Sequence, residues 1–220
     1  YDGQYNGKIY KKEVASTYNS LGIVYDLQGN YPEALKNYFS SLKIREKIGD
    51  KQGIANSCIN IGNLYYSQGN YPDALKNYLV ALKIAEEIRD KHGVAYSYNN
   101  LGNVCYSQGN YPDALKNYIA ALKIAEKIGD KMGIANSYGN IGSVYYSQGY
   151  YPDALKNHFD ALKVEEEIGD NKGIAKSYNN IGNVYTGQAN PKEGRFWLEK
   201  ALSLAREIGD KETIKISYAG

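Results

Sequence analysis

The chain has 220 residues, of which 43% are hydrophobic, so it is long and apolar enough to bury a core. Acidic and basic residues are mixed along it and give a formal net charge of +2, so it lacks the basic stripe typical of nucleic-acid binding. No apolar run approaches the roughly 20 residues that cross a bilayer, and no signal segment opens the chain. We therefore expect a cytoplasmic protein with neither nucleic acid nor membrane as a partner.

The sequence repeats itself every 40 residues. Residues 1–10 fit no part of the unit, and we interpret them as a linker or as the degenerate end of an earlier repeat. The five full units that follow are 11–50, 51–90, 91–130, 131–170 and 171–210, and residues 211–220 begin a truncated sixth. Because the sequence begins with Tyr1 and not with methionine, we expect a processed chain or an excised piece of a larger protein, and favour the excised piece.

The first part of each unit has the apolar spacing of an amphipathic helix, here called helix A. In the third unit Tyr98, Leu101, Gly102 and Cys105 fall at i, i+3, i+4 and i+7. Cysteine replaces tyrosine at this position and also at Cys58. The two cysteines lie on different helices, too far apart along the axis for a disulfide, so we expect free thiols.

A break and a second helix, helix B, complete the unit. In the third unit Gly109 ends helix A, Asn110 or Tyr111 caps helix B, and Pro112 lies in its first turn. Helix B ends at a Gly-Asp pair, whose aspartate caps the next unit. The spacing predicts helices over 12–28, 32–48, 52–68, 72–88, 92–108, 112–128, 132–148, 152–168, 172–188 and 192–208.

The chain resembles tetratricopeptide repeat proteins. The residues that carry the resemblance are Tyr98, Leu101, Gly102, Cys105, Ala114, Tyr118 and Ala121, with Tyr138, Ile141, Gly142, Tyr145, Ala154, His158 and Ala161 one unit later. The unit is longer than the family's usual 34 residues, and this variant is similar to Pins-type adaptors and bacterial regulators. The resemblance implies an all-α, right-handed superhelical solenoid of antiparallel helix pairs, with helix A on the concave face.

The face of helix A opposite the apolar stripe is rich in asparagine and tyrosine, although asparagine is a poor helix former. Asn amides can bond both polar groups of a peptide backbone, and tyrosines are typical of binding surfaces. We therefore predict a protein-binding or peptide-binding groove, lined by Asn60, Asn63, Tyr66, Tyr96, Asn99, Asn100, Asn103, Tyr106, Asn140, Tyr146, Lys176, Asn179, Asn180 and Asn183.

The family resemblance sharpens and limits this prediction. Asn60, Asn100, Asn140 and Asn180 occupy the position at which related superhelices hold peptide backbones. Relatives that clamp a C-terminal carboxylate use several cations, whereas this face has only Lys176, so we do not expect that activity. The competing interpretation is that the asparagines bond one another and only hold neighbouring repeats in register.

Other surfaces have simpler interpretations. The helix B tyrosines Tyr38, Tyr78 and Tyr118 lie on the apolar stripe and are predicted to be core. Two rows of lysines on helix B are predicted to be solvated, namely Lys36, Lys76, Lys116 and Lys156, and Lys43, Lys83, Lys123 and Lys163. In the fifth unit Phe196 and Trp197 occupy positions that are polar elsewhere, so we predict that a following repeat or another chain covers Trp197. The alternative is that Trp197 lies on its own helix pair.

The sequence contains no phosphate loop, serine elbow or clustered metal ligands. His92 and His158 stand alone, and the carboxylates are scattered, so we expect no enzyme and no cofactor. The leading hypothesis is an interaction region of a larger signalling protein. The second is a self-association module, a homo-oligomer that assembles through open solenoid ends.

Overall fold

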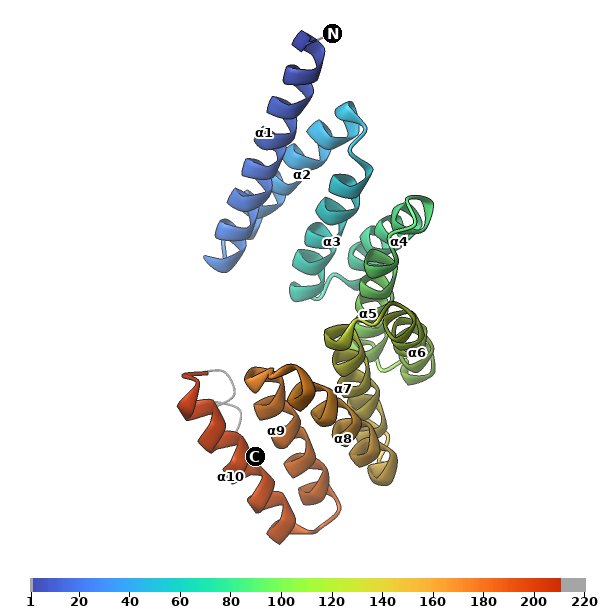
Figure 1. Ribbon diagram of the computed structural model, residues 1–220, viewed down its shortest axis with the longest axis vertical. Helices are drawn as coiled ribbons and strands as arrows, with labels where there is room; N and C mark the ends of the chain where they lie inside the picture. The colour runs from blue at the N-terminus through green and yellow to red at the C-terminus, as the bar shows by residue number, and fades with distance from the viewer. Residues whose placement is uncertain (1, 211–220) are drawn as a thin grey trace. The chain divides into compact units, whose positions relative to one another are not determined.

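The computed structural model describes the backbone of residues 2–210 and the side chains of residues 7–210. Throughout that range the chain is all-α, without strands (Figure 1). Its helices are α1 (Asp2–Leu27), α2 (Tyr31–Ile48), α3 (Lys51–Ser67), α4 (Tyr71–Glu87), α5 (Lys91–Ser107), α6 (Tyr111–Ile128), α7 (Lys131–Ser147), α8 (Tyr151–Ile168), α9 (Asn171–Gly187) and α10 (Pro191–Glu207).

These bounds confirm the predicted helices to within one residue, except at the start of α1. That helix begins at Asp2 and not near residue 12. Residues 2–11 contain no proline, and although Asn6-Gly7 is a turn signal in sequence, extending an existing helix adds one hydrogen bond for each residue fixed. The register of residues 1–10 as part of an earlier repeat stays a prediction, and the truncated sixth repeat, 211–220, lies outside the described residues.

The predicted caps account for the sharp boundaries. Asp50, Asp90, Asp130 and Asp170 precede helices A, and each side chain accepts a hydrogen bond from a glycine amide three residues on. Asn70, Asn110 and Asn190 cap helices B in the same way. At the break between helices, the residue after the last turn of helix A has a positive φ, 73° at Gly109.

The helices form two compact units, one extending to Gln108 with α1–α5 and one beginning at Gly109 with α6–α10. Within each unit, consecutive helices pack against one another, and α3 also contacts α5, as α7 contacts α9. The core of the first unit joins Ala34 and Tyr38 of α2 to Ile61 and Leu64 of α3. Helices A therefore lie side by side within each unit, which brings their asparagine-rich faces together.

An aromatic ring of helix B rests directly on a helix A glycine in most units. A Cβ added to Gly62 would lie 2.6 Å from the ring of Tyr78, and one added to Gly142 would lie 2.7 Å from His158. Tyr38, Tyr78 and Tyr118 are each 2% exposed, which confirms that they are core. His158 takes the same place and is also 2% exposed, so it is a packing residue.

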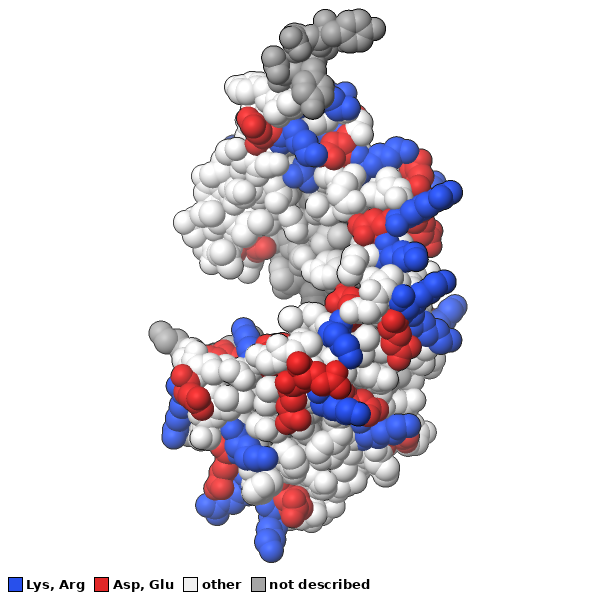
Figure 2. Space-filling model, viewed as in Figure 1, with Lys and Arg blue, Asp and Glu red and all other residues white. Residues whose placement is uncertain are grey.

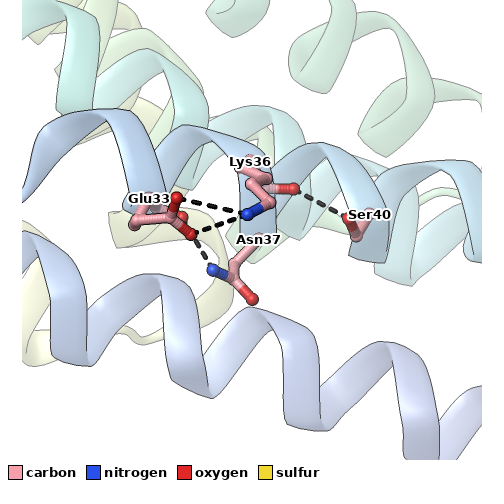
Figure 3. A network of polar contacts seen from close by, with 4 residues as sticks. All are labelled: Glu33, Lys36, Asn37 and Ser40. Atoms are coloured by element: carbon pink, nitrogen blue, oxygen red, sulfur yellow. Dashed lines mark hydrogen bonds and ion pairs between the residues drawn. The ribbon is translucent and has the colours of Figure 1, made fainter.

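Several polar side chains of helix B form hydrogen bonds within their own helix. On α2 the Lys36 ammonium lies 3.1 Å from Glu33, and the Asn37 amide donates to the Glu33 carbonyl (Figure 3). Asn77, Asn117 and Asn157 donate to their own i−4 carbonyls in the same way. These asparagines are thus satisfied within their helix.

Charged side chains of both signs are interspersed over the face shown in Figure 2, while the surface over the C-terminal half of α1 is largely uncharged. The predicted lysine rows are exposed, from Lys36 on α2 to Lys163 on α8. On α1 the apolar side chains of Leu21, Val24 and Leu27 are 41%, 47% and 85% exposed. Apolar exposure is therefore concentrated on the first helix.

Trp197 packs on helices that precede it. Its ring centroid lies 5.5 Å from Phe159 of α8 and 5.5 Å from Tyr178 of α9, and the Lys200 ammonium lies 4.7 Å from it. The ring is half-buried by these contacts, as in the alternative interpretation. Cover by a following repeat would involve residues outside the described part.

Candidate functional site

The predicted groove residues divide between the two units. Asn60, Asn63 and Tyr66 lie on α3, and Tyr96, Asn99, Asn100, Asn103 and Tyr106 lie on α5, all in the first unit. Asn140 and Tyr146 lie on α7, and Lys176, Asn179, Asn180 and Asn183 lie on α9, in the second unit. The side-chain chemistry differs between these two groups.

In the first unit, side chains of neighbouring helices A bond to one another. The Asn60 amide donates to the Asn19 amide oxygen of α1 at 2.9 Å. The hydroxyls of Tyr66 on α3 and Ser107 on α5 lie 2.8 Å apart. Both pairs link adjacent repeats, as the register interpretation predicts.

The next position along the row shows what happens when a partner is missing. Asn100 is 7% exposed and its Nδ2 has no hydrogen-bond partner. At the place that corresponds to Asn19, one repeat on, the chain carries Ile59, which has no acceptor. Asn63 is used differently, because its amide oxygen accepts a hydrogen bond from the Tyr78 hydroxyl at 2.7 Å.

In the second unit the linking side chains between α7 and α9 are replaced by glycine. Gly139 stands at the position of Asn19, so it offers no side-chain acceptor to Asn180. Gly187 stands at the position of Ser107, so it offers no hydroxyl to Tyr146, which instead packs on Tyr151 at a centroid distance of 6.0 Å. The seam between these two helices is consequently open.

A polar pocket of about 60 Å³ occupies this seam. Three predicted groove residues line it together, namely Asn140, Lys176 and Asn180. The remaining lining residues are Ala135, Asn136, Gly139, Ser143, Glu165, Asp170, Gly173 and Ser177. A volume of this size exceeds the roughly 10–15 Å³ that one water needs, so the pocket can take a small polar group.

Glu165, at the end of α8, is the most unusual group in the pocket wall. It is 8% exposed, and its Oε2 has no hydrogen-bond partner. Burial raises the pKa of Glu165, a hydrogen bond from Ser177 and the charge of Lys176 act to lower it, and Asp170 and Glu166 raise it further. A buried carboxylate oxygen without a donor is costly, so the pocket presents unused acceptor capacity.

His158, on the same helix, is a second buried group without full hydrogen bonding. Its Nδ1 lacks a partner, because Ser143 replaces the asparagine that meets Tyr78 in the second repeat, and the Ser143 hydroxyl donates to the Gly139 carbonyl. Burial, followed by the charge of Lys176, lowers the pKa of His158 to about 4. His158 is therefore neutral near neutral pH.

The other predicted residues are not gathered into this pocket. Tyr96 is 50% exposed and Tyr146 39%, whereas Asn179 is buried at 6%. Asn99, Asn103 and Asn183 are half-buried on their helices. Their role in binding stays a prediction.

Sequence reasoning missed Glu165 and Asp170 as pocket residues. A signal was present for Glu165, since the corresponding residues in other repeats include Ala85, Ala125 and Ala205. A charged residue in a row of buried alanines indicates either an internal partner or a ligand. Among residues 7–210 no group of His, Cys, Asp and Glu side chains has the arrangement of a metal site, and no helix in the described part is long and apolar enough to span a membrane.

Comparison with known proteins agrees with the repeat pattern. The family model described as tetratricopeptide repeat matches residues 13–87, 93–167 and 133–207. A search of curated proteins gave no match.

Solved structures share the fold at low sequence identity. BtubC (BKLC) from P. vanneervenii is 20% identical, with a TM-score of 0.81 over 94% of this chain and 86% of that one. Aspartyl phosphate phosphatase F from Bacillus subtilis is 16% identical, with a TM-score of 0.86 over 98% of this chain and 56% of that one. The Rap conjugation gene regulator of plasmid pLS20, solved with the Phr* peptide, is 21% identical, with a TM-score of 0.78 over 91% and 55%.

Proposed function

Since this chain belongs to the tetratricopeptide repeat family, we propose that it is a protein-binding scaffold that holds an extended peptide against its helices A. The observation that carries the proposal is the open seam between α7 and α9, where Asn140, Lys176 and Asn180 line one polar pocket. The peptide-bound structure of the plasmid pLS20 regulator, which has the same fold, supports the class of ligand.

The two units contribute differently in this proposal. The Asn60 amide already donates a hydrogen bond to Asn19, so in this proposal Asn60 links two repeats and does not bind the peptide. Asn140 and Asn180 line the pocket, and Gly139 leaves the seam open, so a ligand's backbone amide can reach both side chains. An Asn side chain there can donate to a peptide carbonyl and accept from a peptide N–H.

The test compares the double variant Asn140→Ala, Asn180→Ala with Asn60→Ala as a matched control. Peptides are first selected on the wild-type chain from a random synthetic library, and their affinities are then measured for each variant. Loss of two hydrogen bonds of about 0.5–1.5 kcal/mol each should weaken binding roughly fivefold to a hundredfold. The fold should remain, because alanine is the better helix former.

The control should retain peptide affinity per folded molecule. If the double variant binds the selected peptides as tightly as the wild type does, the groove assignment is wrong. If the wild-type chain selects no peptide, the proposed function itself is wrong.

We propose self-association as a second function, supported by the apolar face of α1. Val14, Tyr18 and Leu21 line a groove of about 300 Å³ together with Thr17. In the next repeat, Ile61 takes the place of Leu21 and is fully buried against the preceding helix B. The same stripe on α1 could accept a helix B of a second copy.

Light scattering over a range of concentrations tests this second function. The mass of the wild-type chain should rise with concentration, and Leu21→Lys should hold it at the monomer value because a charge in the stripe opposes stacking. Ser20→Lys, next to the stripe, is the matched control and should associate as the wild type does. A wild-type chain that is monomeric at every concentration excludes self-association.

A further inference from the structure

The pocket between α7 and α9 has a counterpart in the first repeat that is filled by the chain itself. Arg45 of α2 occupies the position of Glu165, is 7% exposed, and donates from Nη1 to the Gly53 carbonyl and the Ser57 hydroxyl. Gly53 and Ser57 correspond to Gly173 and Ser177, both of which line the pocket. This place in the repeat is thus able to hold a buried cationic group.

In the fourth repeat the same place has an acceptor and no internal cation bonded to it. Glu165 lines the pocket, and its Oε2 is buried without a hydrogen-bond partner. Lys176 also lines the pocket but is exposed, and it makes no hydrogen bond to Oε2. The carboxylates of Glu165 and Asp170 outnumber this one cation among the lining residues.

We infer that this pocket is a specificity-determining subsite that takes one cationic group of the partner peptide, bonded to the Glu165 carboxylate. The group is either the side chain of a lysine or arginine or the peptide's free terminal amine. This inference rests on the proposed peptide-binding function and names the chemistry by which that groove distinguishes ligands. Asparagine amides on the peptide backbone bind without regard to sequence, whereas a buried carboxylate distinguishes a cationic ligand from a neutral one.

The size and charge of the pocket agree with this ligand. A volume of about 60 Å³ accommodates an ammonium or guanidinium head but not an aromatic ring as well. A cation in the pocket would offset the buried charge of the Glu165 carboxylate, and a hydrogen bond to a charged group contributes about 1.5–3 kcal/mol, so more than tenfold in affinity is expected from it. The raised pKa of Glu165 is consistent with a carboxylate whose charge lacks compensation in the ligand-free chain.

The experiment uses Glu165→Ala, with Glu166→Ala as the matched control. Alanine at 165 restores the residue found at 85, 125 and 205, so the variant should fold, and circular dichroism verifies this. Glu166 is adjacent but exposed, so its replacement makes the same charge change outside the pocket. The probes are two random synthetic peptide libraries, one with free and one with acetylated N-termini.

The wild-type chain and Glu166→Ala should both enrich a cationic group at one register, about tenfold over Glu165→Ala. Enrichment of Lys or Arg that survives acetylation assigns a side chain, and enrichment lost on acetylation assigns the terminal amine. If all three proteins select the same peptides, the subsite is overturned while the proposed function stands. If none of them selects any peptide, the proposed function fails and the inference fails with it.

Discussion

At the scale of single residues, two asparagines at the same position of successive repeats differ in their hydrogen bonding. Asn60 donates to Asn19, while Asn100 is buried with Nδ2 unpartnered. Replacing either with alanine brings the same gain in helix propensity, so the difference between them isolates the hydrogen bond. We expect Asn100→Ala to be more stable than Asn60→Ala by about 1–3 kcal/mol, measured by urea unfolding. Equal stabilities would show that the Asn60–Asn19 bond contributes nothing.

Ala189 is a second residue whose type does not suit its backbone conformation. It has φ = 56°, where Gly109 and Gly149 have 73° and 78° at the same position. A left-handed conformation costs an L-residue roughly 1–2 kcal/mol, partly offset by the flexibility that glycine adds to the unfolded chain. We therefore expect Ala189→Gly to raise stability by about 1 kcal/mol, followed by thermal unfolding. Gly109→Ala is the control and should lower it.

At the scale of the helix, the α7–α8 pair carries a pH dependence that comes from His158. His158 is buried and its pKa is lowered to about 4, whereas in the unfolded chain it is near 6.5. The unfolded state therefore gains a proton first, and stability that is present above 6.5 is lost as pH falls toward 4, by up to about 3 kcal/mol.

The double variant His158→Tyr, Ser143→Asn recreates the Tyr78–Asn63 arrangement and removes this titration. Unfolding followed by Trp197 fluorescence should show the wild type losing stability between pH 6.5 and 4 relative to the variant. The carboxylates titrate in both proteins, so their effects cancel in the comparison. Parallel pH profiles would mean that folding leaves the pKa of His158 unshifted.

The helices could be predicted from sequence because the residues that cap and end them recur from repeat to repeat. Asp130 and Gly109 act through local backbone geometry, so their caps and turns were evident without a structure. The start of α1 was not, because the turn signal Asn6-Gly7 lies inside the helix and does not end it.

The site was only partly predictable. Asn140, Lys176 and Asn180 followed from the face of helix A on which they lie, but the pocket depends on what faces them across the seam. Gly139 contributes to the pocket because it has no side chain, and Glu165 contributes because its Oε2 has no hydrogen-bond partner. These features depend on contacts between repeats, and the helical periodicity of the sequence does not predict such contacts.

At the scale of the whole molecule, the described helices of each unit contact their near neighbours in the chain, as in other repeat proteins. Stability is then a sum of local terms, and the two units need not unfold together. Trp197 is the only tryptophan, so its fluorescence reports on the second unit, while circular dichroism reports on all helices.

Two matched glycine variants use this difference. A Cβ on Gly142 would lie 2.7 Å from His158 in the second unit, and one on Gly22 would lie 2.5 Å from Tyr38 in the first. Overpacking of this kind costs about 1–3 kcal/mol. We expect Gly142→Ala to lower the urea midpoint of Trp197 fluorescence below that of circular dichroism. Gly22→Ala should shift the circular dichroism curve and leave the fluorescence midpoint unchanged. If both probes move together in both variants, the repeats unfold as one cooperative unit, and local destabilisation in one unit is shared by the entire chain.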